Sequence, residues 1–238
     1  MTQSSLPRLQ SIAIDGPAGS GKSTLGRALA QRLGFLYFDT GVMYRAVALA
    51  ALERGLAKDD ENAISQLAET LVIEVLPPDA EDGRAYTVRI DSRDVTWALR
   101  APEVEAIVGV VSTYPRVRTA LVRQQRRIAQ RGAVVMVGRD IGTVVLPEAD
   151  FKIYLDASPE VRAERRVREL RARNIQADYQ AVLANLRQRD YLDTHRADSP
   201  LRPAHDAVIV DSTHMDAEDT LDYVWRLLME RAALHFGR

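Results

Sequence analysis

A glycine-rich segment near the start of the chain places the strongest constraint on its fold. It lies between the apolar run Ser11–Asp15 and the apolar-periodic stretch Leu25–Ala30, and it reads Gly16-Pro17-Ala18-Gly19-Ser20-Gly21-Lys22-Ser23-Thr24. This order of strand, glycine loop and helix, with the spacing G-x-x-x-x-G-K-S, is that of a P-loop. Glycines let successive backbone N–H groups converge on one anion, and the dipole of the following helix adds positive potential there. The segment therefore predicts a binding site for a nucleoside triphosphate.

The polar side chains of this loop have separate expected roles. Lys22 supplies a mobile positive charge for the transferred phosphate, and the Ser23 hydroxyl is expected to reach Mg²⁺ bound with the nucleotide. Lys22 is also one of only three lysines, with Lys58 and Lys152, in a chain whose positive charge is otherwise arginine. A glycine turn before a helix is common for structural reasons alone, but the lysine, the serine and the strand together favour nucleotide binding. We expect all of residues 16–24 to contact ATP.

Composition argues against several other classes of protein. The 238 residues include no cysteine, which excludes disulfides, thiolate metal sites and cysteine nucleophiles. The net charge of −1 creates no global attraction to nucleic acid or membrane. The four histidines lack metal-ligand spacing, no apolar stretch approaches the length of a membrane span, and the first ten residues lack a signal-peptide pattern. We expect a cytoplasmic monomer with neither nucleic-acid nor membrane partners.

Short apolar runs alternate with helical patterns along most of the chain. This alternation indicates an α/β fold in which a five-stranded parallel sheet is covered by helices on both faces. The predicted strands are Ser11–Asp15, Phe35–Asp39, Ala133–Val137, Phe151–Asp156 and Ala207–Asp211. The predicted helices are Lys22–Leu33, Gly41–Arg54, Pro115–Arg131, Pro159–Arg173, Tyr179–Tyr191 and Thr220–Phe236.

The segment from about Asn62 to Val111 interrupts the alternation. Apolar runs at 71–76 and 86–90, separated by Pro77-Pro78 and acidic residues, predict a β-hairpin or meander. We expect this segment to be a small antiparallel insertion in a single domain spanning residues 11–238, preceded by a flexible N-terminus, residues 1–10.

Two polar clusters follow predicted strands, where ligands bind in parallel sheets. Thr40 either caps the next helix or binds a ligand, and Arg45, one turn into that helix, is placed to fork onto a second phosphate. Arg139 and Asp140 stand between two glycines after the third strand. They either pair with each other on the surface or face a ligand, and their position at a strand end favours the ligand.

Two further clusters lie on predicted helices. Arg189, Asp193 and Arg196 share one helix face, and this spacing alone favours an exposed face with ordinary ion pairs. The arginine-dense segment at about 160–190 allows three interpretations: a charged exposed helix, a mobile lid over the triphosphate, or an RNA-binding helix. Interleaved glutamates and the neutral net charge disfavour RNA binding.

With these segments in order, the chain resembles the bacterial cytidylate kinases, the (d)CMP kinases of the nucleoside monophosphate kinase family, over residues 11–213. The resemblance implies a P-loop kinase that transfers the γ-phosphoryl group of ATP to CMP or dCMP with Mg²⁺. It also implies that residues 62–111 bind the monophosphate and that about 160–190 form a helical lid. The shared motifs are Ile14-Asp15-Gly16-Pro17, Asp39-Thr40-Gly41 with Tyr44-Arg45, Tyr114-Pro115-Arg116-Val117-Arg118, Gly138–Val145 and Asp211-Ser212-Thr213.

The resemblance assigns roles residue by residue. Arg118 and Asp140 would face the cytosine, whose exocyclic amine donates to a carboxylate and is missing from uracil. Asp193 would hold the sugar hydroxyls, so the resemblance replaces the exposed-face interpretation of its cluster. Thr40 would contact the substrate, and the acceptor phosphate and transferred group would be surrounded by Arg45, Arg139, Arg189 and Arg196. The catalytic set implied is Lys22, Arg139, Arg189 and the lid arginines Arg165 and Arg166.

Three residues depart from the family pattern. Gly109 stands where relatives carry a serine that contacts the base, with Ser112 as a possible substitute, which leaves the tolerance of UMP open. Val137 precedes Gly138 where relatives often have aspartate, and Ser23 follows the P-loop lysine where many have glycine. The order of preference between CMP and dCMP is not predicted.

Two other functions are compatible with parts of the pattern. One is a P-loop kinase for a hydroxyl acceptor such as shikimate, with Asp39 as the carboxylate near the acceptor. The other is a non-catalytic nucleotide-binding or RNA-binding protein. The concentration of arginines expected to face phosphate favours a phosphorylated acceptor.

Overall fold

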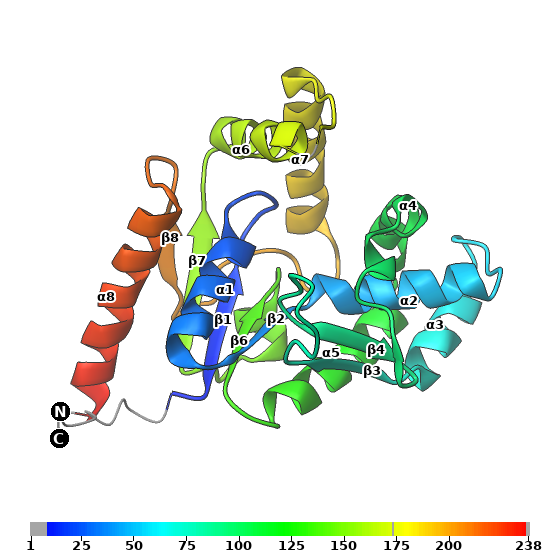
Figure 1. Ribbon diagram of the computed structural model, residues 1–238, viewed down its shortest axis with the longest axis horizontal. Coiled ribbons are helices and arrows are strands. Elements are labelled where there is room, and N and C mark those ends of the chain that lie inside the picture. The colour runs from blue at the N-terminus through cyan, green and yellow to red at the C-terminus, as the bar shows by residue number, and fades with distance from the viewer. Residues whose placement is uncertain (1–8, 173, 237–238) are drawn as a thin grey trace. The chain divides into compact units, whose positions relative to one another are not determined.

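The computed structural model describes residues 9–172 and 174–236, without the side chains of residues 232 and 234–236 (Figure 1). This part of the chain forms two compact units, the first from within 1–34 and 137–238 and the second from 35–136. Most of the expected flexible N-terminus, residues 1–8, and the predicted helix end at Arg173 lie outside the described residues. None of the helices in the described ranges combines the length and apolar character that crossing a bilayer requires.

A five-stranded parallel sheet is present, with the strands in the order β2-β6-β1-β7-β8. All five predicted strands are confirmed, with ends that differ by at most one residue. Asp15 lies opposite Tyr154, and Asp156 lies opposite Asp211, so the carboxyl ends of three strands meet at one edge. The strands are β1 (Ser11–Asp15), β2 (Leu36–Asp39), β6 (Val134–Val137), β7 (Phe151–Asp156) and β8 (Val208–Asp211).

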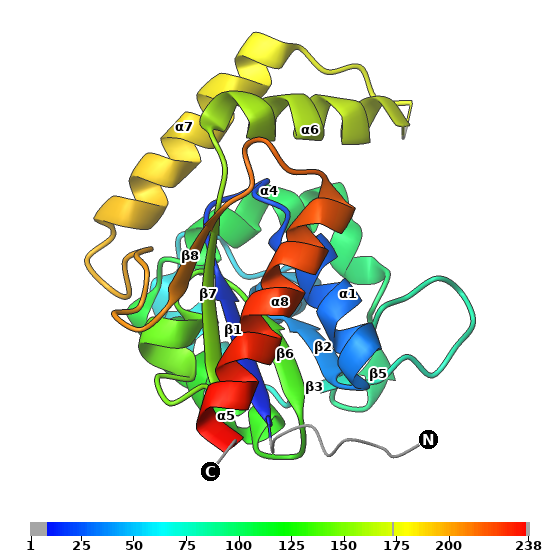
Figure 2. The same cartoon turned by 90° about the vertical axis from the view of Figure 1, so that its left-hand side faces the viewer.

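The first unit contains β1, β7 and β8 with four helices and a π-helical turn. α1 and α8 pack together on one side of β1 and β7 (Figure 2). α6 and α7 pack against each other through Ala163, Leu183 and Leu186, here called the α6–α7 core. These elements are α1 (Lys22–Leu33), the π turn (Ile141–Val145), α6 (Pro159–Ala172), α7 (Tyr179–His195) and α8 (Ala217–Phe236).

The second unit contains the predicted hairpin, and Val75 of β3 lies opposite Val88 of β4. Two helices that flank the hairpin in sequence, α3 and α4, were not predicted. Their signals are present in the sequence: Asp60 caps α3 by accepting from the N–H of Ala63, and Pro102 occupies the first turn of α4. The elements are α2 (Gly41–Glu53), α3 (Glu61–Thr70), β3 (Ile73–Leu76), β4 (Thr87–Ile90), β5 (Arg93–Asp94), a 3-10 turn (Ala98–Arg100), α4 (Pro102–Val111) and α5 (Pro115–Ala129).

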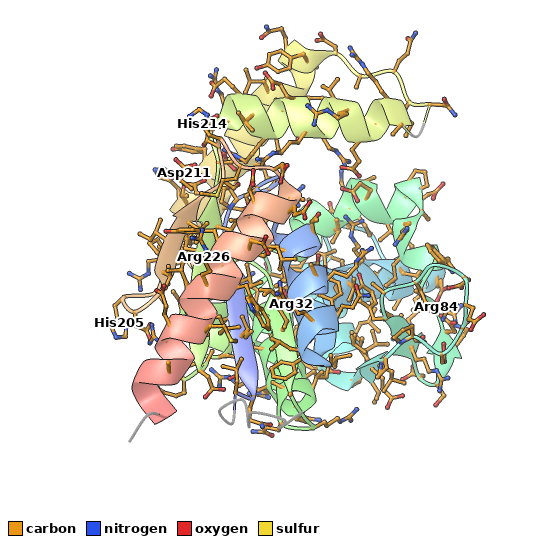
Figure 3. The ribbon with its side chains drawn as sticks, turned by 60° about the vertical axis from the view of Figure 1, so that its left-hand side comes forward. Arg32, Arg84, His205, Asp211, His214 and Arg226 are labelled. Carbon is orange, nitrogen blue, oxygen red and sulfur yellow. The ribbon has the colours of Figure 1, made fainter. Side chains whose placement is uncertain are left out.

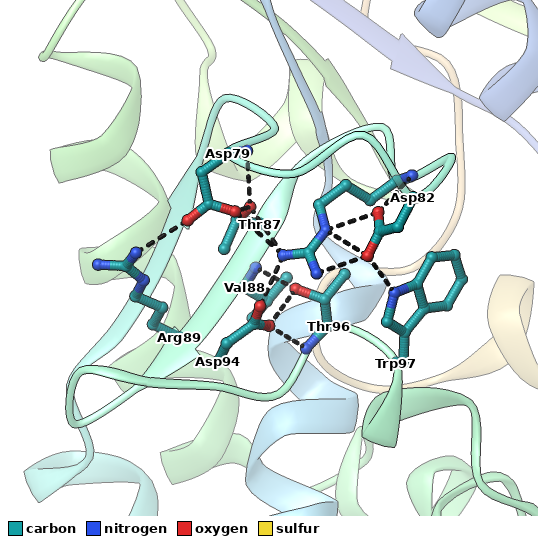
Figure 4. Close-up of polar contacts among 9 residues, drawn as sticks. Asp79, Asp82, Thr87, Val88, Arg89, Asp94, Thr96 and Trp97 are labelled. Carbon is teal, nitrogen blue, oxygen red and sulfur yellow. Dashed lines mark hydrogen bonds and ion pairs between the residues drawn. The ribbon is translucent and has the colours of Figure 1, made fainter.

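One arginine holds the connection between β3 and β4. The Arg84 guanidinium lies 3.1 Å from Asp79, 2.7 Å from Asp82 and 2.6 Å from Asp94, and its side chain is buried (Figure 4). Asp82 also accepts a hydrogen bond from the indole N–H of Trp97 at 2.7 Å. The hydrogen bonds from Arg84 and then Trp97 hold the pKa of Asp82 well below its usual range. The connection therefore has a defined shape although it lacks regular secondary structure.

Candidate functional site

The loop between β1 and α1 has the geometry of a P-loop. Gly16 has φ 146°, and a Cβ atom there would lie 2.0 Å from the carbonyl oxygen of Leu155, so only glycine fits. Gly21, the N-cap residue directly before α1, has φ 96° and lies in the left-handed region. The Lys22 ammonium is buried and donates to the carbonyl oxygen of Pro17 at 2.6 Å. The loop thus wraps around the Lys22 side chain at the N-terminus of α1. A glycine-rich loop at a helix N-terminus is the arrangement that binds nucleotide phosphates.

The buried carboxylate of Asp15 joins this loop to the turn after β6. It accepts hydrogen bonds from the N–H groups of Ile141 and Gly142, both at 2.7 Å. Burial raises the pKa of Asp15 to about 6, against the lowering effect of these two hydrogen bonds. The nearby Asp140 carboxylate contributes to this rise, and Lys22 opposes it. Asp15, the residue before the P-loop, therefore fixes the backbone conformation of the two residues that follow Arg139 and Asp140.

Arg139 and Asp140 do not pair with each other, as the surface interpretation would require. Arg139 donates from Nε to Asp193 at 2.9 Å, and Asp140 lies 3.9 Å from Nη2 of Arg196. The end of α7 therefore meets the turn after β6, and the exposed-face interpretation is wrong for Asp193 and Arg196. Arg189, on the same helix, is exposed.

The two expected lid arginines have different surroundings. Arg165 donates to the carbonyl oxygens of Ser212 at 2.6 Å and Met215 at 3.0 Å, and burial lowers its pKa. These carbonyls belong to the segment from β8 to α8, which also carries Asp211 and His214 (Figure 3). Arg166 pairs with Glu169 at 2.8 Å on the surface of α6. A contact of either arginine with phosphate stays a prediction.

Three residues at this site were not predicted as site residues: Arg162, Asp190 and Tyr154. Arg162, on α6, is buried and pairs with Asp190 of α7. Its signal in the sequence is weak: it stands beside Ala163, on the buried side of a helix rich in other arginines. Tyr154, opposite Asp15 in the sheet, was also missed; burial and the carboxylates of Asp156 and Asp15 raise its pKa to about 12.

The second unit carries three of the predicted substrate residues, beginning with Thr40 and Arg45. Thr40 occupies the position before α2, but its side chain makes no capping hydrogen bond. The Asp39 carboxylate instead accepts from the N–H of Gly41 at 3.0 Å. Arg45, one turn into α2, pairs with Glu105 of α4. The capping role considered for Thr40 is therefore not adopted in this structure.

Arg118, the third of these residues, is buried within the second unit. It donates to the carbonyl oxygen of Ser112 at 3.3 Å, and its guanidinium lies 5.7 Å from the centre of the Tyr44 ring. The Ser112 hydroxyl donates to the carbonyl oxygen of Gly109 at 2.9 Å. A Cβ atom added to Gly109 would meet nothing within 4 Å. The family serine missing at this position would therefore fit.

Side chains that suit a metal ion are sparse. Among the described residues, no three His, Asp or Glu side chains form a group that could hold one. Both oxygens of Asp15 already accept from backbone N–H groups. Ser23 is an exposed residue on the first turn of α1, next to Lys22. It fits the role of a single oxygen ligand to Mg²⁺ whose other ligands are phosphate oxygens and water.

The glycine loop, its buried lysine and the parallel sheet define a P-loop kinase fold. A family model described as cytidylate kinase matches residues 12–230. The chain belongs to the cytidylate kinase family.

Relatives of known name cover nearly the whole chain. It is 54% identical over 229 residues to the cytidylate kinase of Chloroflexus aggregans, covering 96% of this chain and 98% of that protein. It is 49% identical over 221 residues to the cytidylate kinase of Roseiflexus castenholzii, covering 92% and 94%. A solved structure of an uncharacterized protein from Eubacterium ventriosum is similar with a TM-score of 0.51 at 10% identity, covering 92% and 98%, which shows the fold alone.

Proposed function

We propose that this chain transfers the γ-phosphoryl group of ATP to the phosphate of CMP or dCMP, giving ADP and CDP or dCDP. The observation that carries the proposal is the pair of hydrogen bonds from Ile141 and Gly142 to Asp15. Through them the P-loop is held beside the turn that presents Arg139 and Asp140. A site for donor phosphate and a carboxylate suited to cytosine therefore belong to one compact unit. The sequence identity of 54% to a cytidylate kinase supports CMP or dCMP as the acceptor.

The chemistry requires positioning and charge neutralisation. The acceptor phosphate is an anionic nucleophile, so no general base is needed, and catalysis rests on in-line alignment. The Lys22 ammonium exchanges the Pro17 carbonyl for a phosphate oxygen, while Arg139, Arg189 and Arg196 neutralise the developing charge. Ser23 would hold Mg²⁺ bound with ATP, and the ion would supply positive charge against the triphosphate.

The remaining residues select and enclose the acceptor. Asp140 accepts from the cytosine amine, Arg118 faces the same base, and Asp193 binds the sugar hydroxyls. Thr40 and Arg45 bind the monophosphate together with residues 62–111, whereas Arg165 and Arg166 act from the lid. We further propose that the protein works as a cytoplasmic monomer, which sedimentation and cell fractionation test.

The test is ADP release from ATP·Mg²⁺ with CMP, dCMP, UMP, AMP, shikimate or no acceptor. Turnover with CMP and dCMP above all others is the expected result. Equal turnover with UMP would show that base selection is loose. The proposal would be overturned if shikimate were the only acceptor that supports turnover. It would also be overturned if none of the acceptors supported turnover.

A further inference from the structure

Arg162 connects three segments of the first unit through one buried guanidinium. Its Nε atom donates to the carbonyl oxygen of Ala157 at 2.8 Å, and its Nη1 atom donates to that of Ala18 at 3.0 Å. The two outer nitrogens also donate to both carboxylate oxygens of Asp190, at 3.0 and 2.6 Å. Only 3% of the Arg162 side chain is exposed. The planar fork of arginine makes these contacts in fixed directions, which the single ammonium of lysine does not.

Packing brings the same segments together. Ala18, at the tip of the P-loop, packs against the α6–α7 core. A Cβ atom at Gly19 would lie 3.3 Å from Cβ of Arg162, so the loop passes directly over this helix. Hydrogen bonding and packing therefore hold the tip of the P-loop against α6 and α7 independently of each other.

We propose that Arg162 is a positioning residue that sets the distance between the P-loop and α7. Asp190, which it holds, directly follows Arg189 on α7, and Asp193 lies one turn further. The loop that holds the donor phosphate and the helix that carries acceptor-binding side chains are thereby aligned. This inference rests on the proposed function. Packing alone does not explain the residue, because burying an arginine is costly and an apolar side chain would fill the space.

The test compares Arg162→Met, Arg162→Lys and Asp190→Asn with a control pair on the same two helices. Arg187 of α7 and Glu160 of α6 lie 2.7 Å apart, but both are exposed and their pairing does not involve the P-loop. We expect kcat to fall about tenfold or more in each Arg162 or Asp190 variant, because small misalignments are costly in transfer reactions. KM for ATP and for CMP should change much less, and Arg187→Met should retain kcat. Equal kcat in Arg162→Lys, Asp190→Asn and Arg187→Met would overturn the inference.

A second measurement does not depend on turnover, and it uses only those variants whose circular dichroism shows that they fold. Backbone amides of residues 18–21 should exchange hydrogen faster in Arg162→Lys and Asp190→Asn than in Arg187→Met. Unchanged exchange would show that Arg162 does not hold the loop. Lack of CMP-dependent turnover in the unsubstituted protein would overturn the proposed function instead, and the exchange comparison would still decide whether Arg162 positions the P-loop.

Discussion

Arg139 donates from Nε to Oδ2 of Asp193 at 2.9 Å across 54 positions of sequence. Both side chains are largely buried, with 21% and 19% of their surface exposed. The carboxylate proposed to bind the sugar therefore also orients an arginine proposed to bind phosphate. Sugar and phosphate binding are expected to be coupled through this contact.

Replacing Asp193 with alanine is expected to weaken binding of both the sugar and the phosphate of CMP. KM for CMP should rise about tenfold or more, because charge-assisted hydrogen bonds are lost, whereas KM for ATP should change little. Combining this change with Arg139→Met should cost less than the sum of the two single effects. Initial-rate kinetics check this, with Asp198→Ala on the segment beyond α7 as the control. Strict additivity would show that the contact has no functional role.

Lys22→Ala is expected to abolish phosphoryl transfer. The ammonium is the P-loop charge proposed to contact the transferred group, so kcat should fall about a thousandfold or more. Lys58→Ala, which removes an exposed lysine, should leave kcat unchanged. Steady-state turnover with saturating ATP and CMP decides the matter. A Lys22→Ala enzyme with near-normal kcat would contradict the assignment of the loop.

Gly109→Ser is expected to sharpen base selection. The position lies on α4 with open space around it, and the family resemblance implies a serine contact with the base. The ratio of kcat/KM for CMP to that for UMP should rise about threefold or more, the value of one hydrogen bond. Gly109→Ala is the matched control, because it adds the same Cβ atom at this helix position without adding a hydroxyl. Identical ratios in both variants would show that the hydroxyl does not reach the base.

Asp15 should make the stability of the fold depend on pH. Its pKa is raised from 3.8 to about 6, so the folded state favours the protonated form. The resulting stabilisation is complete below pH 3.8 and is lost as the pH rises through 6. A shift of this size corresponds to about 3 kcal/mol. The free energy of unfolding of the wild type, minus that of Asp15→Asn, should therefore decrease from pH 4 to 7.

Denaturant titrations at several pH values measure this difference directly. Titrating groups that do not interact with Asp15 behave alike in both proteins and cancel in the subtraction. A difference that stays constant across this range would mean that Asp15 has an ordinary pKa in the folded protein.

Residues close together in sequence carried most of what was predicted correctly. The P-loop is nine consecutive residues, and the strand runs alternate with helices whose apolar faces are visible in the sequence. α7 is an exception at its end, since it continues to His195 rather than Tyr191. Apolar periodicity stops at Tyr191, but the last turn is held from outside, by Arg139 on Asp193.

The sequence by itself determined the P-loop, the α/β sheet and the family, because these depend on local patterns and motifs. Only the tertiary structure decided which of the arginines on α6 is buried. Arg162 and Arg166 belong to the same charged pattern, yet one meets Ala18 and Asp190 and the other stays on the surface. The reason is physical: the cost of burying a guanidinium is offset only where distant acceptors converge on it, and that convergence is a property of the folded chain.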